Sequence, residues 1–257
     1  MRPTLLLVGT ADTKSDEILY LRSRVEAAGG AALVMDVGVL APAAFAPEVD
    51  HHAVAAAAGS SISAVREAGD ENSAMQIMAR GAARLAADLH AQGRIDGLLA
   101  LGGSMGTDLA LDVASALPLG VPKVVLSTVA HSHLIAPERI APDLISVLWA
   151  GGLYGLNAVC RSVLSQAAGA AIGACLAAEA PRGDRPLVGM TSLGKSCLSY
   201  MVALKPALEA RGYELAVFHT TGMGGRAFEA LAHKRFFAAV MDFSLQELVN
   251  HLAGSCV

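Results

Sequence analysis

A glycine-rich turn near the middle of the chain has the composition of a phosphate-binding site. It follows the apolar residues 98–101 and contains Gly102, Gly103, Ser104, Gly106 and Thr107. Where a strand leads through glycines into a helix, unpaired backbone N–H groups and the positive end of the helix dipole face an anion. The spacing matches neither the Walker A loop nor the dinucleotide fingerprint, so a purely structural turn is the alternative interpretation.

Other polar residues follow three apolar segments that we expect to be strands, residues 4–8, 31–35 and 123–126. An acidic residue after the second of these strands binds a ribose in dinucleotide folds, but it can equally cap a loop. Ligands of open parallel sheets lie over the carboxyl ends of the strands, so these residues are candidates for one binding site. They are Gly9, Thr10, Asp12, Thr13 and Lys14 after the first segment, Asp36 after the second, and Ser127 and Thr128 after the third.

A second strand–turn–helix pattern begins after the polar, proline-bounded residues 180–186. Gly189 and the run Gly194-Lys195-Ser196 have the spacing of a Walker A loop, although Gly189 falls inside the expected strand. We therefore expect Lys195 to face a ligand without a complete P-loop around it. A later turn offers a second set of anion-binding residues, Thr221, Gly222, Gly224, Gly225 and Arg226.

Alternating strand and helix patterns position these turns. Residues 18, 21, 25 and 28 form one apolar helix face, with Thr13 and Asp16 spaced as a cap, and Asp70 begins a longer amphipathic helix. A strand, a helix and a strand in succession predict parallel strands with right-handed crossovers. The chain is therefore predicted to be α/β, with two Rossmann-like, doubly wound and mainly parallel subdomains at residues 1–180 and 187–257, the second incomplete.

The composition argues against several classes of function. The chain has 257 residues, of which 54% are hydrophobic and 16% charged, and its formal net charge is −4. Because basic runs are lacking, we expect no nucleic-acid partner. The alanine-rich residues 163–180 are interrupted by polar residues and glycines, so we expect a packed helix and no membrane partner. The start of the chain has no signal-peptide pattern and the cysteines are scattered, which together indicate a cytoplasmic protein.

Taken in order, these segments resemble a family, the ATP-binding amino-terminal domain of the tomato mosaic virus replication inhibitor and its bacterial relatives. The resemblance rests on residues 8–14, 34–38, 93–97, 102–107, 120–123, 155–157 and 217–227, which span nearly the whole chain. It implies two Rossmann-like subdomains, with ATP, with or without Mg²⁺, in the cleft between them. It also implies self-association into a homo-oligomer such as a dimer.

Two features depart from the family pattern. Family members are longer, so the chain looks C-terminally truncated relative to them and keeps only three strands of the second sheet. Residues 129–148, which include His131 and His133, differ from the usual loop. Two histidines one residue apart can chelate a metal, but no third ligand accompanies them, so we predict no metal site.

Three functions fit these residues, and the binding of ATP or another phosphorylated ligand in the cleft is the leading one. An enzyme acting on a small carbonyl or carboxylate metabolite would use Lys14 or Lys195 electrostatically and Asp12 or His219 for proton transfer. A protein-interaction module would bind nucleotide only to stabilise its fold. The sequence places no nucleophile beside a base, so it does not decide between these alternatives.

Overall fold

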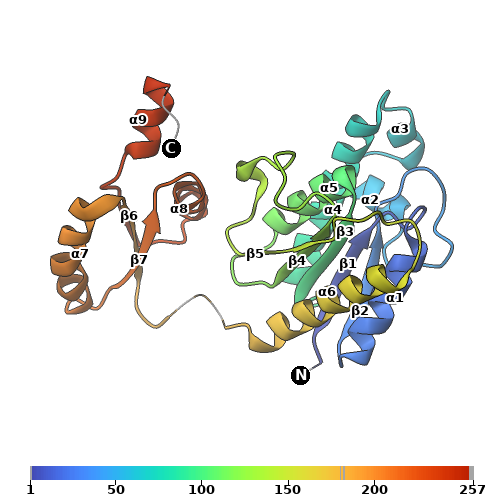
Figure 1. Ribbon diagram of the computed structural model, residues 1–257, viewed down its shortest axis with the longest axis horizontal. Helices are drawn as coiled ribbons and strands as arrows, with labels where there is room; N and C mark the ends of the chain where they lie inside the picture. Colours follow the sequence, from blue (N-terminus) through green and yellow to red (C-terminus); the bar gives the residue numbers. More distant parts are fainter. Residues whose placement is uncertain (1, 180, 182, 255–257) are drawn as a thin grey trace. The chain divides into compact units, whose positions relative to one another are not determined.

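The computed structural model describes residues 2–179, 181 and 183–254, and the chain forms two compact units (Figure 1). Unit 1 comprises Met1–Glu179 and unit 2 comprises Ala180–Val257. Each unit has a parallel sheet with helices packed against it, so the predicted α/β fold is confirmed. Ala180 and Arg182 of the expected linker lie outside the described residues.

Unit 1 is built on a five-stranded parallel sheet in the order β2-β1-β3-β4-β5. Most of its side chains are apolar and buried, as expected for a parallel sheet that is covered on both faces. The strand order reverses between β1 and β3, because the chain adds β2 on one side of β1 and later strands on the other. The strands are β1 (Thr4–Gly9), β2 (Ala31–Asp36), β3 (Gly97–Gly102), β4 (Lys123–Ser127) and β5 (Leu144–Leu148).

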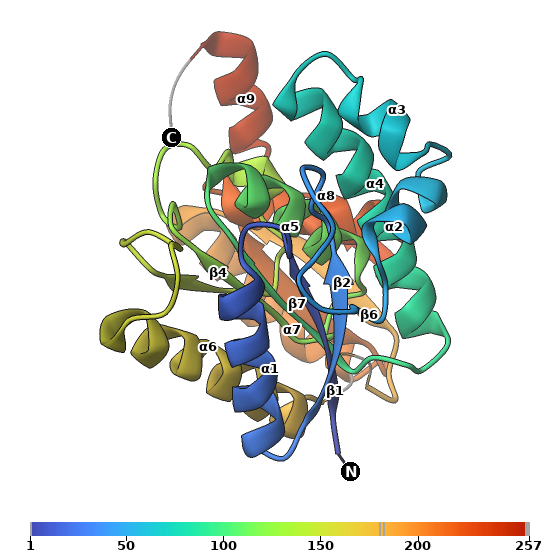
Figure 2. The same ribbon diagram turned by 90° about the vertical axis from the view of Figure 1, so that its right-hand side faces the viewer.

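Helices cover both faces of this sheet, which makes unit 1 doubly wound. Alternate residues of β1 divide between the faces, because successive side chains of a strand point in opposite directions. One face packs against α1 (Ser15–Ala27) and α6 (Ala158–Ala177), and Figure 2 shows both helices on the same side of β1 and β2. The other face packs against α2 (His51–Ala57), α3 (Ile62–Arg66), α4 (Glu71–Ala91) and α5 (Ser104–Ala116).

Side-chain caps begin four of the helices in unit 1. Each cap accepts a hydrogen bond from the backbone N–H three residues later, which satisfies one of the free donors at a helix start. The cap expected at Thr13 is wrong, because α1 begins after Lys14 and the Thr13 hydroxyl bonds to the hydroxyl of Thr10. The four capping residues are Asp50, Ser61, Asp70 and Asn157.

Unit 2 has a three-stranded parallel sheet in the order β7-β6-β8. The rings of Phe218, Phe228 and Phe237 pack together at its centre, with centroids 5.6 to 5.7 Å apart. Figure 1 shows α7 and α8 on opposite sides of the sheet. The elements are β6 (Leu187–Ser192), α7 (Gly194–Glu209), β7 (Glu214–His219), α8 (Met223–His233), β8 (Ala239–Met241) and α9 (Gln246–Ala253).

Within the described ranges, α6 is long and apolar enough to cross a membrane, judged by length and composition only. One face of this helix is buried in unit 1, where Leu164 and Ile172 belong to the core that also contains the α1 side chains. The expectation of a packed helix in this segment is therefore confirmed. The described cysteines, Cys160, Cys175 and Cys197, are free thiols.

Candidate functional site

A cavity of about 800 Å³ lies at the carboxyl edge of the unit 1 sheet. The turn after β1 and the turn after β3 both line it, so it lies where the strand order reverses. Connections leave neighbouring strands toward opposite faces at such a reversal, and the crevice between them is the usual ligand site of doubly wound sheets. The predicted site residues that line this cavity are Thr10, Asp12, Thr13, Lys14, Gly102, Gly103, Ser104 and Gly106.

The glycine turn allows α5 to start directly after the end of β3. A Cβ on Gly102 would lie 2.4 Å from the carbonyl carbon of Gly106, so a side chain at this position would overlap the backbone. Gly103 is the N-cap of α5, and the nearest atom to an added Cβ there is Thr128 Oγ1 at 3.9 Å. Ser104 and Met105 of the first turn of α5 line the cavity, and Gly103 adds no side chain there. The free N–H groups of a helix start are suited to an anion.

Thr107 and Ser127, which the sequence offered as phosphate ligands, instead bind each other. Their hydroxyl oxygens are 2.7 Å apart and both residues are buried. Ser127 Oγ also accepts a hydrogen bond from the backbone N–H of Val129 at 3.0 Å, and the N–H of Thr128 donates to the Gly102 carbonyl at 3.2 Å. These bonds fasten the glycine turn to the end of β4, so the three residues position the cavity wall.

The turn after β1 contributes charge and hydroxyl groups to the cavity. The N–H groups of Thr13 and Lys14 donate to the Thr10 carbonyl at 3.1 and 2.9 Å, which closes the turn. Lys14 Nζ lies 5.5 Å from the centre of the Tyr154 ring. Asp12 Oδ2 accepts a hydrogen bond from the N–H of Leu40 at 2.9 Å, while its Oδ1 has no hydrogen-bond partner in the part of the chain that is described.

Asp36 is buried and does not line the cavity. Its Oδ1 accepts hydrogen bonds from the N–H groups of Ala11 at 2.9 Å and Gly38 at 2.8 Å, which joins the turns after β1 and β2. Burial raises the pKa of the Asp36 carboxyl, and the two N–H donors and His51 only partly oppose this effect. The structure thus favours the loop-capping interpretation of Asp36 over the ribose interpretation.

Gly9 is also a packing residue. A Cβ at this position would lie 2.7 Å from Cδ2 of Leu101, so its place at the end of β1 reflects close contact with β3. The residue does not line the cavity.

A further wall of the cavity comes from the long connection between β2 and α4, which the sequence did not indicate as a ligand site. Arg66 is held there by a hydrogen bond from its Nε to the Val39 carbonyl at 2.6 Å. The length of this connection was the sequence feature that could have indicated a binding role, because most connections in compact domains are short and long ones are often functional. The wall residues of the connection are Val39, Leu40, Arg66, Glu67, Gly69 and Asp70, and Glu71, Ala74 and Met75 of α4 continue the wall.

In unit 2, the Walker A spacing does not form a phosphate-binding loop. Gly189 lies inside β6 and packs against Phe237, where an added Cβ would lie 2.8 Å from the ring. Only Leu193 separates β6 from α7, which leaves no loop to surround a phosphate. Lys195 is an exposed residue in the first turn of α7.

The turn before α8 holds a carboxylate of the chain itself. Gly222, the N-cap of α8 with φ +92°, donates its N–H to Glu247 Oε1, and a Cβ on Gly225 would overlap the same carboxylate. A negative charge at a helix start is stabilised by the helix dipole. Glu247 therefore occupies the anion position that we predicted at Gly222, Gly224 and Gly225. Thr221 and Arg226 are exposed on either side of this turn.

Among the described residues, no group of three histidine, cysteine, aspartate or glutamate side chains is arranged to hold a metal ion. His131 and His133 are exposed in the loop between β4 and β5. This loop instead borders a smaller pocket on α5.

Comparison with known families accounts for both units. Residues 3–180 match the family model described as Uncharacterised protein family (UPF0261) N-terminal domain, and residues 185–257 match the corresponding C-terminal domain. The chain belongs to the UPF0261 family. A UPF0261 protein of Brucella suis is 56% identical over 255 residues, which cover 99% of this chain and 61% of the relative. The chain thus spans 61% of that relative's length.

More distant matches include a plant protein and a solved structure. The ToMV resistance protein Tm-1(GCR237) of Solanum lycopersicum is 28% identical over 280 residues, covering 98% of this chain and 36% of the tomato protein. The relationship to the tomato protein is therefore confirmed as sequence similarity. The structure of UDP-N-acetylglucosamine 2-epimerase from Rickettsia bellii aligns with a TM-score of 0.35 and 10% sequence identity. The alignment covers 95% of this chain and 69% of the epimerase chain.

Proposed function

We propose that unit 1 binds ATP or a related phosphorylated small molecule in the cavity between the turns after β1 and β3. The observation that carries this proposal is that one cavity is lined by both turns at the reversal of strand order. Its volume of about 800 Å³ falls in the range of small-molecule sites, which extends from about 300 to 1,000 Å³. A cavity of this volume is large enough for a nucleotide.

The electrostatics of the cavity support a phosphate at the glycine turn. The helix start at Gly103 and Ser104 presents N–H groups, and α1 also begins at the cavity, next to Lys14. Lys14 and Arg66 are the cations among the lining residues, so both would attract the anionic end of a ligand. The same lining contains four carboxylates, Asp12, Glu67, Asp70 and Glu71.

These carboxylates favour a phosphate ligand that arrives with a cation. A free triphosphate would be repelled by them, whereas Mg²⁺ is held through one or two carboxylates together with substrate phosphates. Asp12 lies in the same turn as Lys14, and its buried Oδ1 has no hydrogen-bond partner in the described ranges. We therefore propose the Mg²⁺ complex of ATP as the bound species.

Isothermal titration of the intact chain with Mg–ATP and with Mg–tripolyphosphate tests the proposal. The site tolerates a side chain at Gly103, since an added Cβ has no neighbour closer than 3.9 Å. Both aspartate and asparagine are good N-caps, so Gly103→Asp and Gly103→Asn should fold equally well. Only the aspartate adds a negative charge beside the phosphates, and we expect it to weaken binding by about tenfold or more relative to the asparagine variant.

Two results would count against this proposal. Absence of a binding heat with both ligands in the folded wild-type chain would remove the phosphate site. Equal affinities in Gly103→Asp and Gly103→Asn would move the ligand away from the start of α5.

The two alternative functions receive unequal support. For the enzyme hypothesis, Lys14 and Asp12 line the cavity of unit 1, but Lys195 and His219 belong to unit 2. For the protein-interaction module, and for self-association, unit 2 exposes many apolar side chains on a small sheet whose outer strands are β7 and β8. They include Leu198, Val202, Val240, Phe243, Leu245, Leu248, Val249 and Leu252.

We therefore propose a cytoplasmic homo-oligomer, such as a dimer, as the working form of the protein. Native mass spectrometry of the purified chain would report both the number of copies and any co-purified nucleotide. A strictly monomeric chain at micromolar concentration would contradict this part of the proposal. The ligand cleft between the subdomains stays a prediction.

A further inference from the structure

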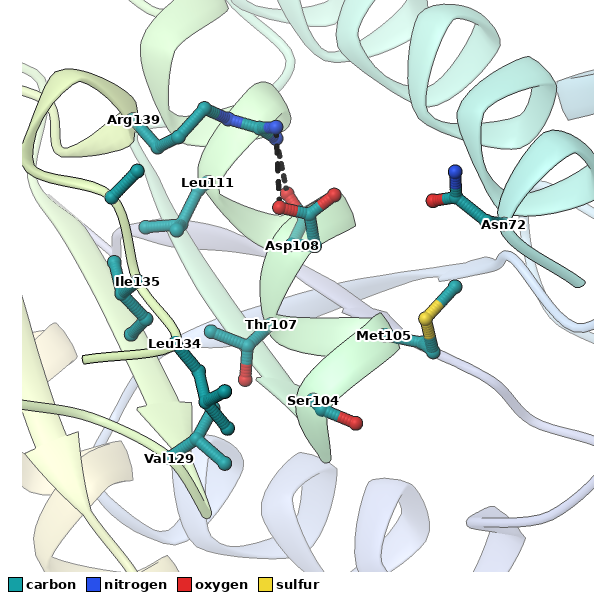
Figure 3. A pocket seen from close by; sticks show the side chains of 11 residues that line it. Asn72, Ser104, Met105, Thr107, Asp108, Leu111, Val129, Leu134, Ile135 and Arg139 are labelled. Atoms are coloured by element: carbon teal, nitrogen blue, oxygen red, sulfur yellow. Dashed lines mark hydrogen bonds and ion pairs between the residues drawn. The ribbon is translucent and has the colours of Figure 1, made fainter. Parts of the chain in front are cut away.

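A second, smaller pocket of about 240 Å³ lies along α5, beside the loop that connects β4 and β5 (Figure 3). It meets the large cavity at the start of α5, where Ser104 and Met105 line both. The proposed phosphate site uses the backbone at this helix start, so the small pocket is a separate volume next to it.

Most of the wall of the small pocket is apolar. Leu111 of α5 and Val129, Leu134 and Ile135 of the loop face one another across it, as Figure 3 shows. Leu134 is 62% exposed although its neighbours are apolar. A pocket with such walls favours the apolar body of a small molecule, because burying that body removes apolar surface of both partners from water.

The charged groups at this pocket form a triad of two carboxylates and one guanidinium. Arg139 Nη1 lies 3.2 Å from Asp108 Oδ1, and Arg139 Nη2 lies 2.8 Å from Asp112 Oδ1. Arg139 Nη2 also donates to the Asp108 carbonyl at 3.0 Å. The guanidinium is thus bonded on both terminal nitrogens, and the triad carries a net charge of about −1 when both carboxyls are ionised.

Asp108 and Asp112 differ in their relation to the pocket. Asp108 lines it, whereas Asp112 lies one helical turn further along α5 and does not. Burial raises the pKa of the Asp112 carboxyl. The positive charge of Arg139 lowers this pKa only in part, and the negative charge of Asp108 raises it further. In Figure 3 one carboxylate oxygen of Asp108 faces Arg139 and the other faces the side of the pocket where Asn72 lies.

We propose that this pocket binds a small molecule with an apolar body and a protonated amine, with Asp108 as the counter-ion of the amine. An anionic ligand is disfavoured, because Arg139 is already bonded to two carboxylates and the net charge nearby is negative. The Asn72 amide offers a further hydrogen-bond acceptor across the pocket. An amine bound here would lie next to the start of α5, where the proposed phosphate ends.

Three probes with one ring and different charges test this proposal in the intact chain. They are benzylamine, benzyl alcohol and phenylacetate, and binding is followed by the methyl NMR signals of Ile135 and Leu111. We expect benzylamine to shift both signals and to bind about fivefold more tightly than benzyl alcohol, and phenylacetate to bind most weakly. No phosphate is present, so this outcome is independent of whether the large cavity binds ATP.

Asp108→Asn and Asp112→Asn form a matched pair of variants. Each removes one carboxylate partner of Arg139 and leaves the other, but only Asp108 lines the pocket. We expect Asp108→Asn to weaken benzylamine binding by about fivefold, and Asp112→Asn to leave it nearly unchanged. The methyl spectrum of each variant shows at the same time that it is folded.

Several outcomes would overturn the proposal. Unshifted Ile135 and Leu111 signals at millimolar benzylamine would show that the pocket does not take this ligand class. Phenylacetate binding as tightly as benzylamine would show that the site does not select a cation. Equal effects of Asp108→Asn and Asp112→Asn would show that Asp108 acts only by holding Arg139.

Discussion

The two adjacent glycines after β3 have different reasons to be glycine. An added Cβ on Gly102 would meet backbone atoms of Gly106 and Thr107 at 2.4 and 2.6 Å, and backbone cannot rotate away as a side chain can. An added Cβ on Gly103 meets nothing closer than 3.9 Å. Gly102 is therefore required by packing, and Gly103 is open to substitution that affects only the ligand.

This difference predicts opposite outcomes for two alanine variants. Gly102→Ala should lower the free energy of unfolding by about 1–3 kcal/mol or more, because the strand and helix must move apart. Gly103→Ala should change it by less than about 1 kcal/mol, since a poorer N-cap is offset by a less flexible unfolded chain. Urea denaturation followed by circular dichroism measures both, and equal losses would contradict the packing argument.

The buried carboxyl of Asp36 makes stability depend on pH. Burial raises its pKa above the ordinary value of an aspartate carboxyl, so the native state binds a proton at a higher pH than the unfolded chain does. The contribution of Asp36 to the free energy of unfolding therefore falls as pH rises from the unfolded pKa through the raised native pKa. The ionised carboxylate is tolerated above that window because two N–H groups bind it.

Asp36→Asn should remove this pH dependence and keep the fold. The amide oxygen can accept the same two hydrogen bonds, and the amide nitrogen can donate to Nδ1 of His51, which lies 3.5 Å from Asp36 Oδ2. Relative to the wild type, the variant should gain stability as pH rises through the window. Urea denaturation at a series of pH values measures this difference. Asp36→Ala, which loses both hydrogen bonds, should be destabilised at every pH, and a flat difference for Asp36→Asn would refute the assignment.

At the scale of the elements, the helix starts differ in whether a side chain caps their first N–H groups. The helix α6 begins at Asn157, whose side chain accepts a hydrogen bond from the N–H of Cys160 at 2.9 Å. By contrast, α1 and α5 begin at Lys14 and Gly103 without a side-chain cap. The start of α4 also borders the cavity but is capped by Asp70, so α1 and α5 are the described helices at the cavity whose first N–H groups have no side-chain cap.

Removing the cap of α6 should destabilise unit 1 modestly. Asn157→Ala should lower the free energy of unfolding by about 1 kcal/mol, because one N–H group at the helix start loses its acceptor. Asn157→Ser provides the control, since serine is an equally good cap and should be nearly neutral. Chemical denaturation of the two variants gives the comparison, and a neutral alanine variant would show that water replaces the cap.

At the scale of the whole molecule, the proposed nucleotide site belongs to unit 1 alone. Every residue that lines the large cavity lies in Met1–Glu179, and this unit has a core on each face of its sheet. In unit 2, the corresponding helix start of α8 is occupied by Glu247. Unit 1 should therefore fold and bind ligand by itself.

A fragment of residues 1–179 tests this assignment. We expect it to unfold cooperatively and to bind Mg–ATP within about threefold of the affinity of the whole chain, because no lining residue is removed. Calorimetric titration of the fragment and the whole chain under the same conditions measures the ratio. A folded fragment that binds at least about tenfold more weakly would contradict the assignment of the whole site to unit 1.

Local patterns determined much of this protein. Apolar runs predicted the strands, the period of three and four residues predicted α1 and α4, and the helix start expected at Asp70 was correct. The rule that ligands lie over the carboxyl ends of parallel strands predicted that the turns after β1 and β3 lie together, and both line one cavity. These features depend on neighbouring residues and on the handedness of the chain, both of which a single sequence contains.

Only the tertiary structure decided which candidate residues line the cavity. Asp36 and Ser127 end strands and Thr107 follows the glycine turn, as predicted, yet hydrogen bonds to other segments hold all three side chains in the interior. The packing of Gly189 against Phe237 likewise explains why a glycine with the Walker A spacing lies inside a strand. The glycine turn at Gly102 is thus one wall of a cavity whose other wall, from Arg66 to Met75, is brought there by folding. Side-chain direction depends on contacts far apart in sequence, and no local pattern contains them.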